Sequence, residues 1–265
     1  MIGLAVPLDG RTALVTGANA GIGRAIALAL AANGANLIVH HHGDPEGATG
    51  TAASAEKCGR KVQVLAADFT EEGAARALAD DAAAAGRVDI LVANAAIEVR
   101  CPWDEITDTH IDRHVSANFS ALVAMCQRLL PPMTAAGWGR VIAIGSIMAS
   151  RPRAETLVYA ALKSAQLTAI QAMAREVAGR GVTMNVISPG AVEIERTAER
   201  YADPAFRAAV TAKIPAGRPA GVDDLVGPAL FLASDAAGYV TGANIPVDGG
   251  WSIGDPPGTL PGPAQ

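Results

Sequence analysis

Residues 12–23 read TALVTGANAGIG, an apolar run followed by a turn that contains three glycines. The run 12–16 predicts a buried strand, and the apolar periodicity of 22–33, closed by Gly34, predicts a helix after the turn. Glycines in such a turn let a pyrophosphate approach main-chain N–H groups at the positive end of the helix. The spacing departs from G-x-G-x-x-G, so an ordinary strand-to-helix loop remains the alternative to a dinucleotide site.

Strand-type runs alternate with helical patterns along the rest of the chain. The further strands are expected at 36–40, 62–66, 89–93, 140–144, 183–187 and 243–247. This alternation predicts right-handed βαβ units and therefore an α/β fold of the Rossmann type: a doubly wound, mainly parallel seven-stranded sheet with helices on both faces. No repeat, linker or charge block divides residues 1–265, so we expect a single domain.

Composition and charge exclude several classes of protein. Of the 265 residues, 50% are hydrophobic and 18% are charged, which excludes a disordered chain. The formal charge of −5 offers no basic footprint for nucleic acid. The apolar runs are too short for a membrane span, and the first residues lack the basic region of a signal peptide. Three cysteines far apart in the sequence fit a reduced compartment, so we expect a soluble cytoplasmic protein.

Tyr159 and Lys163 are four residues apart and project from one face of the helix expected over 157–178. A nearby ammonium favours phenolate, so Lys163 is expected to lower the pKa of Tyr159 towards working pH. Ser146 follows the strand 140–144 and reaches the carboxyl edge of the sheet, where open α/β folds bind ligands. A Tyr-x-x-x-Lys pair by itself is also common on solvated helices.

Several motifs follow one another in order over residues 9–251. They are the glycine turn, Ala93-Asn94-Ala95-Ala96, Asn118, Ser146, Tyr159-x-x-x-Lys163, Asn185-x-x-Ser188-Pro189-Gly190, and Thr241-Gly242 with Asp248-Gly249-Gly250. The ordered set resembles the classical short-chain dehydrogenase/reductase family. The resemblance implies hydride transfer between a nicotinamide and a secondary alcohol or ketone.

The resemblance also implies roles for four catalytic residues. Tyr159 is the general acid/base, and Lys163 holds the nicotinamide ribose. Ser146 donates a hydrogen bond to the substrate oxygen, and Asn118 anchors the water of a proton relay. The implied cofactor contacts are Gly17, Asn19, Gly21, Ile22, Gly23, His42, Asp68, Phe69, Asn94, Tyr159, Lys163, Pro189, Gly190 and Val192. Ile194 stands where many relatives have a threonine that binds the carboxamide, which leaves Thr197 as the candidate replacement.

The expected second strand ends in His40-His41-His42, where an acidic residue would favour NAD by repelling a 2′-phosphate. We therefore expect NADP to be favoured over NAD. Neighbouring side chains on a strand point to opposite faces, so the three imidazoles do not converge on a metal. His110 and His114 have helical spacing but no indicated cysteine or acidic partner, and we expect no metal site.

The expected substrate is a small molecule. Ser146 and Tyr159 would contact its reacting oxygen, and Glu98, Arg151 and Arg153 would contact the rest. These polar groups favour a sugar, polyol or sugar acid; a 3-ketoacyl-thioester reductase and a non-catalytic nucleotide-binding redox regulator are the alternatives. Residues 191–220 are the expected substrate lid, and 252–265 the expected flexible or subunit-contacting tail. The family resemblance further implies a homotetramer.

Overall fold

The computed structural model describes residues 6–254. Seven strands form one sheet in the order β3-β2-β1-β4-β5-β6-β7, and every neighbouring pair is parallel. The strands are β1 (Thr12–Val15), β2 (Asn36–His41), β3 (Val62–Ala66), β4 (Ile90–Ala93), β5 (Gly139–Ile144), β6 (Val182–Pro189) and β7 (Asn244–Val247). The predicted Rossmann-type fold is confirmed, with a sheet that is parallel throughout.

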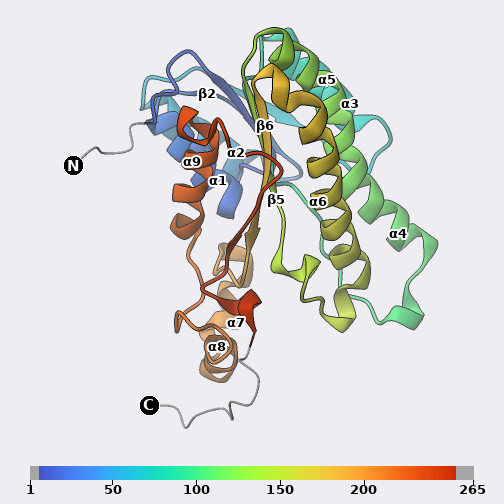
Figure 1. Cartoon of the computed structure of the whole chain (residues 1–265). Coiled ribbons are helices and arrows are strands. Elements are labelled where there is room, and N and C mark those ends of the chain that lie inside the picture. The colour runs from blue at the N-terminus through green and yellow to red at the C-terminus, as the bar shows by residue number, and fades with distance from the viewer. Residues whose placement is uncertain (1–5, 255–265) are drawn as a thin grey trace.

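Helices cover both faces of this sheet (Figure 1). One layer contains α1 (Gly21–Ala32), α2 (Pro45–Glu56) and α9 (Val226–Ala233). The opposite layer contains α3 (Ala74–Ala84), α4 (Asp108–Val115), α5 (Ala121–Ala135) and α6 (Leu157–Val177). Each layer encloses its own cluster of buried aliphatic side chains, which explains why the inner strands are apolar on both faces.

The packing of α1 shows why the first motif folds as it does. Ile26 and Leu30, one turn apart, are fully buried against the sheet, and Ala27 beside them allows close approach. Burying one such aliphatic side chain stabilises the fold by about 1.5–3 kcal/mol. The helix ends where Gly34 takes a φ of +109°, as expected for a glycine just beyond a helix.

The order of the strands reverses around β1, which pairs with β2 on one side and β4 on the other. In a parallel sheet all carboxyl ends lie at one edge, and loops diverge where the order reverses. The glycine turn after β1 and the loops after β4, β5 and β6 therefore meet at this edge. The fold places the ligand-binding crevice there before any side chain is considered.

Two short helices, α7 (Ala198–Ala202) and α8 (Pro204–Thr211), follow β6 and form a lobe below the sheet (Figure 1). A bridge between Val192 and Ala220 closes the base of this excursion, which spans the predicted lid. Of the predicted tail, 252–253 belong to the 3₁₀ turn Trp251–Ile253, and 255–265 lie outside the described residues. No helix between residues 6 and 254 is long and apolar enough to cross a membrane.

Candidate active site

A cavity of about 1870 Å³ opens at the carboxyl edge of the sheet. It brings together nearly all of the residues predicted from the sequence. Those lining it are Gly17, Asn19, Gly21, Ile22, His42, Asp68, Phe69, Asn94, Glu98, Ser146, Arg151, Arg153, Tyr159, Lys163, Pro189, Gly190 and Val192. Gly23 and Asn118 lie behind the wall of the cavity and act on it through their neighbours.

The glycine turn is shaped by close contacts that only glycine permits. Gly17 has a φ of +63°, and a Cβ at Gly23 would lie 2.2 Å from the carbonyl oxygen of Gly17. Asn94 at the end of β4 fastens the turn, because its Nδ2 donates to the carbonyl oxygens of Thr16 (2.8 Å) and Gly17 (3.2 Å). Its N–H donates to the Thr16 hydroxyl at 2.9 Å. The turn is thus fixed in advance beside the N-terminus of α1, a geometry suited to a pyrophosphate.

His40 supports this turn from β2. Its Nδ1 accepts the N–H of Gly17 at 3.1 Å, and its Nε2 lies 3.1 Å from the carbonyl oxygen of Ala67, which requires the Nε2–H tautomer. The ring stacks on Phe69 with 4.4 Å between centroids. Burial lowers the pKa of His40 to about 4, so the imidazole is neutral at physiological pH. The sequence did not indicate this supporting role.

The end of β2 carries one histidine into the cavity. His42 lines the cavity, and its Nε2 lies 3.8 Å from the Asp68 carboxylate. The nearest acid after the histidines, Asp44, is the N-cap of α2 and also accepts a hydrogen bond from Asn19 at 2.9 Å. These two hydrogen bonds lower the pKa of Asp44. The Asp44 carboxylate therefore stabilises the start of α2 and the glycine turn.

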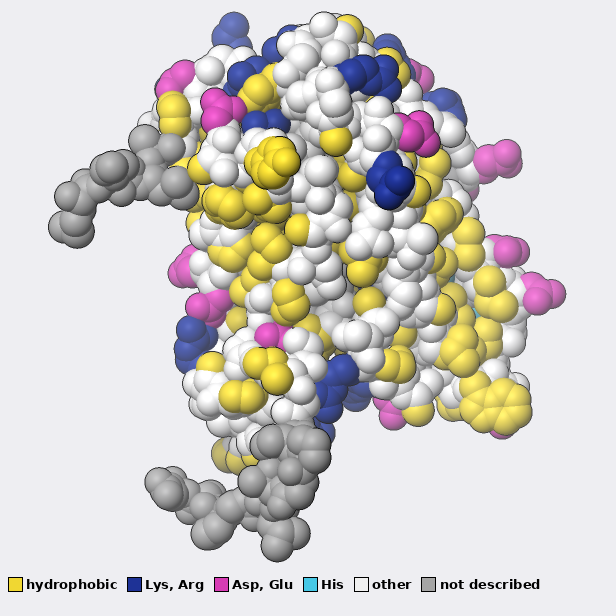
Figure 2. Space-filling model, viewed as in Figure 1, with side chains coloured by type: hydrophobic (Ala, Val, Ile, Leu, Met, Phe, Trp, Pro, Cys, Tyr) yellow, Lys and Arg dark blue, Asp and Glu magenta, His cyan; other side chains and the backbone are white. Residues whose placement is uncertain are grey.

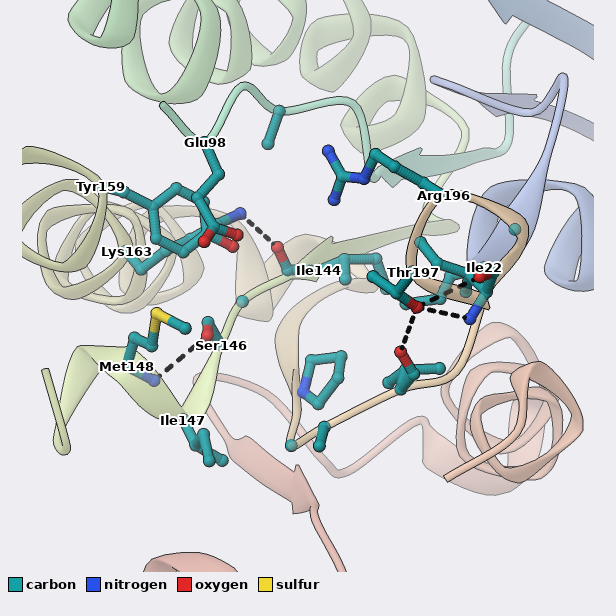
Figure 3. A pocket seen from close by; sticks show the side chains of 18 of the residues that line it. Ile22, Glu98, Ile144, Ser146, Ile147, Met148, Tyr159, Lys163, Arg196 and Thr197 are labelled. Atoms are coloured by element: carbon teal, nitrogen blue, oxygen red, sulfur yellow. Dashed lines mark hydrogen bonds between the residues drawn. The ribbon is translucent and has the colours of Figure 1, made fainter. Parts of the chain in front are cut away.

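Ser146, Tyr159 and Lys163 converge from two elements (Figure 3). Ser146 is the N-cap of the 3₁₀ turn Ile147–Ala149 after β5, and its Oγ accepts the N–H of Met148 at 3.1 Å. Tyr159 and Lys163 lie one turn apart on α6. Nζ of Lys163 donates to the carbonyl oxygen of Ile144 at 2.6 Å and lies 5.5 Å from the centre of the Tyr159 ring. A hydroxyl donor, a phenol and an ammonium therefore face one space.

Burial is the main cause of the pKa shifts of Tyr159 and Lys163. It raises the pKa of Tyr159 to about 12, and the Glu98 carboxylate adds to the rise, whereas the Ser146 hydroxyl and the Arg196 guanidinium oppose it. Burial also lowers the pKa of Lys163 to about 8. The expected fall of the Tyr159 pKa towards working pH is wrong for the protein alone, because desolvation outweighs the Ser146 hydrogen bond and the Arg196 charge. The phenol is neutral and able to donate a proton at pH 7.

Asn118 lies in a single π-helical turn, Ser116–Ser120, between α4 and α5. Its side chain accepts the N–H of Ile97 at 2.9 Å and donates to the carbonyl oxygen of Ile97 at 2.8 Å. This double contact fixes the loop after β4, next to Glu98. Both the oxygen and the nitrogen of the Asn118 side chain thus bond the backbone of Ile97. A proton relay through Asn118 stays a prediction.

The three residues expected to contact the body of the substrate all line the cavity. The Glu98 carboxylate lies 3.6 Å from Nε of Arg100. Arg151 donates to the carbonyl oxygen of Trp251 at 2.6 Å, and Arg153 lies 3.7 Å from Glu155. In Figure 2, Lys and Arg side chains gather beside the lobe of α7 and α8 at the lower edge of this face. Arg151 and Arg153 thus each already have one partner within the protein.

Thr197 stabilises the turn after β6. Its Oγ1 accepts the N–H of Ile194 at 3.0 Å and lies 3.1 Å from the carbonyl oxygen of Ile194. Arg196 beside it, a charged residue of the expected lid, reaches the cavity from this turn (Figure 3). One further neighbour of the catalytic group was not assigned from the sequence. This is Gln166, whose Oε1 lies 3.3 Å from Nζ of Lys163. The spacing Lys163–Gln166 on one helix face was the available signal for it.

Comparisons with known proteins identify similar oxidoreductases. A family model described as "Enoyl-(Acyl carrier protein) reductase" matches residues 17–252. The chain is 35% identical over 248 residues to 3beta-hydroxysteroid dehydrogenase 1 of Eggerthella lenta, covering 93% of this chain and 95% of the relative. It is 35% identical over 245 residues to 2-dehydro-3-deoxy-D-gluconate 5-dehydrogenase of Pseudoalteromonas atlantica, covering 92% and 96%.

The structural comparison gives the same family. A 3-oxoacyl (acyl-carrier-protein) reductase from Agrobacterium tumefaciens, solved with NADP bound, superimposes with a TM-score of 0.89 at 39% identity. The match covers 94% of this chain and 97% of that structure. The names of these relatives refer to steroid, sugar-acid and acyl-carrier substrates, so similarity alone does not select among the three substrate classes.

Proposed function

Because the chain belongs to the classical short-chain dehydrogenase/reductase family and is an oxidoreductase, we propose that it uses NADP(H) to interconvert a secondary alcohol and a ketone on a sugar acid or polyol. The observation that carries the substrate class is the charged lining of the cavity around Ser146 and Tyr159. Glu98, Arg151 and Arg153 line it together with Arg196. Such groups suit a substrate rich in hydroxyl and carboxylate oxygens.

The cavity fits a nicotinamide dinucleotide on two counts. The glycine turn leaves main-chain N–H groups beside the N-terminus of α1, and the space runs continuously from that turn to Lys163. The cofactor, when bound, supplies or accepts the hydride. Gly17, Asn19, Gly21 and Ile22 would hold its diphosphate half, and Lys163 and Val192 its nicotinamide half.

The proposed chemistry assigns one task to each catalytic side chain. Tyr159 gives a proton to the substrate oxygen during reduction and takes it back during oxidation. Ser146 donates a hydrogen bond to the same oxygen and stabilises the charge that develops there. Lys163 binds the nicotinamide ribose, and Asn118 supports the water that resupplies the proton. The neutral phenol and the adjacent ammonium at neutral pH fit the reductive direction.

His42 supports the preference for NADP. At the end of β2 the cavity is lined by His42, and the first acidic residue that follows it, Asp44, is held by Asn19 and Gly47. An imidazole can donate to a 2′-phosphate, whereas a carboxylate would repel it. Steady-state kcat/KM with NADP and NAD tests this preference in the unmodified protein. His42→Asp should reverse the ratio of the two values; an unmodified protein that prefers NAD contradicts the proposal.

A substrate panel tests the proposed substrate class. The panel pairs aldonic acids and alditols with acetoacetyl-CoA, each with both nicotinamides, and follows the absorbance of the reduced cofactor. We expect turnover of the polyhydroxylated compounds. Turnover of acetoacetyl-CoA alone would favour the 3-ketoacyl-thioester reductase, for which Arg100, Arg151 and Arg153 offer a basic mouth. Nucleotide binding without turnover of any compound would favour a redox regulator.

The lid, assembly and location follow as parts of the same proposal. Residues 191–220, with α7 and α8, close over the substrate. A homotetramer in the cytoplasm buries the outer face of α6, where Leu157 is 49% exposed beside Ala160 and Ala161 in a shallow apolar hollow. Sedimentation at two concentrations tests the tetramer, and a monomer at both would contradict it.

A further inference from the structure

Arg196 reaches the reacting centre from the lid. It lies in the 3₁₀ turn Glu195–Thr197 after β6, and its guanidinium projects into the cavity that contains Tyr159 and Lys163 (Figure 3). Ser146 and Tyr159 line the same cavity. Arg196 is therefore close enough to contact a molecule bound at Ser146 and Tyr159.

Within residues 6–254, the Arg196 guanidinium forms no ion pair or hydrogen bond. The other arginines around the cavity are engaged. Arg100 pairs with Glu98, Arg153 pairs with Glu155, and Arg151 donates to the backbone. Arg200, four residues further on, lies over the ring of Phe206 at 4.6 Å. The donors of Arg196 are thus available to a ligand, whereas the guanidinium of Arg200, which also lines the cavity, lies against an aromatic ring.

The backbone that carries Arg196 is held firmly. Thr197 clips the turn through its two contacts with Ile194, at 3.0 and 3.1 Å. The base of the lid is fastened by main-chain hydrogen bonds of 2.8 Å from Glu193 to Ala220 and from Ala220 to Ala191. Because the backbone is already held, a ligand that binds the guanidinium has only the Arg196 side chain to order.

Glu98 bears on how an acidic substrate would be oriented in the cavity. It reaches the same cavity from the loop after β4, whose backbone is held by Asn118. Figure 3 shows Glu98 beside Tyr159 and the Arg196 guanidinium on the lid side of it. Glu98 repels a carboxylate but accepts hydrogen bonds from hydroxyl groups. We therefore expect an acidic polyol to place its carboxylate away from Glu98 and towards Arg196.

We propose that Arg196 binds the carboxylate of an acidic polyhydroxy substrate while Glu98 accepts a hydrogen bond from one of its hydroxyls. This inference rests on the proposed function, because it deepens the substrate class of the same site. A guanidinium and a carboxylate match as two parallel hydrogen bonds, a geometry that a lysine cannot reproduce. Arg196 is then a specificity residue that contacts the substrate away from the reacting carbon.

The first test compares D-gluconate with D-sorbitol, which carries a hydroxymethyl group in place of the carboxylate. We expect Arg196→Gln to raise KM for gluconate by roughly 10- to 100-fold, with kcat within about threefold and sorbitol kinetics unchanged. Arg196→Lys should lie between Gln and the unmodified protein. Arg200→Gln removes the same charge from the same lid and should change KM for gluconate by less than about threefold.

Two results with an active enzyme would overturn the inference. One is an unchanged KM for gluconate in Arg196→Gln. The other is an equal rise in Arg200→Gln, which would mean that Arg196 is not the specific contact of the carboxylate and that the positive charge of the lid attracts the acid.

The second test does not need turnover. Tartrate is titrated calorimetrically into the NADP-loaded protein, and Arg196→Gln should weaken its binding about tenfold or more, with the Kd for NADP unchanged. If the unmodified enzyme oxidises neither gluconate nor sorbitol, the proposed function fails, and this titration still decides the role of Arg196. Equal tartrate affinity in the two proteins, or no binding to either, would refute it.

Discussion

The main-chain N–H of Gly17 donates a hydrogen bond of 3.1 Å to Nδ1 of His40, so the end of β2 holds the glycine turn that follows β1. The contact requires a neutral imidazole, because a protonated ring has no acceptor. The conformation of the glycine turn, which would hold the cofactor diphosphate, therefore depends on the protonation state of His40.

Replacing His40 with phenylalanine should abolish part of the acid sensitivity of the fold. Burial lowers the pKa of His40 to about 4, so between pH 6.5 and 4 the unfolded chain binds a proton that the folded protein does not. Folding stability therefore falls as the pH falls through this window, by roughly 3 kcal/mol. Urea unfolding at several pH values checks this. His42→Phe, at a side chain that is 65% exposed, is the control and should keep the full acid dependence.

Gly23→Ala should distort the glycine turn and weaken cofactor binding. The new Cβ would meet the carbonyl oxygen of Gly17 at 2.2 Å and Nδ2 of Asn94 at 2.6 Å, so the backbone has to move. We expect NADPH affinity to fall by about a hundredfold and stability by about 1–3 kcal/mol. Gly50→Ala, inside α2 with open space around it, should instead stabilise the protein by about 0.5–1 kcal/mol. Fluorescence titration and thermal melts measure both, and normal NADPH binding by Gly23→Ala would contradict this account.

Lys163→Met should inactivate the enzyme and stabilise its fold at pH 7. Burial lowers the pKa of Lys163 to about 8, so keeping the ammonium in the folded protein costs on the order of 3 kcal/mol below that pH. Loss of the hydrogen bond to Ile144 offsets part of the gain. Because the unfolded chain is protonated up to pH 10.5 and the folded protein only to about 8, the advantage of the variant shrinks as the pH rises across this interval. Melts at pH 7 and pH 10 measure it, and an advantage that grows with pH would be inconsistent with a buried ammonium.

Tyr159→Phe separates catalysis from cofactor binding. Removal of the hydroxyl should lower kcat by about a thousandfold, since the proton donor to the substrate oxygen is lost. The Kd for NADPH should stay within about threefold, because the ring remains on α6. Tyr239→Phe, at a fully exposed tyrosine, should leave both constants unchanged. A Tyr159→Phe enzyme with ordinary kcat would remove this residue from the mechanism.

The strands and the helices around the motifs could be predicted from the sequence because they depend on local spacing, and most of the expected cavity residues followed from the family resemblance. Tyr159 and Lys163 needed only a helix to lie together. The contact of His40 with Gly17 could not be predicted, because it joins residues 23 positions apart through one ring nitrogen. The direction of the Tyr159 pKa was missed because desolvation depends on the packing of the whole pocket. The freedom of Arg196 likewise depends on which partners its neighbouring arginines find.

Asn118 and Thr197 each hold a loop through its backbone: Asn118 bonds Ile97, one residue before Glu98, and Thr197 bonds Ile194, two residues before Arg196. These contacts use no atom of Glu98 or Arg196 themselves. If Glu98 and Arg196 contact the substrate as proposed, their substitution should change the substrate preference while the two loops keep their paths and Tyr159 keeps its place. Such a division allows new specificities to evolve without passing through an inactive intermediate, as expected of a fold whose relatives act on steroids, sugar acids and acyl carriers.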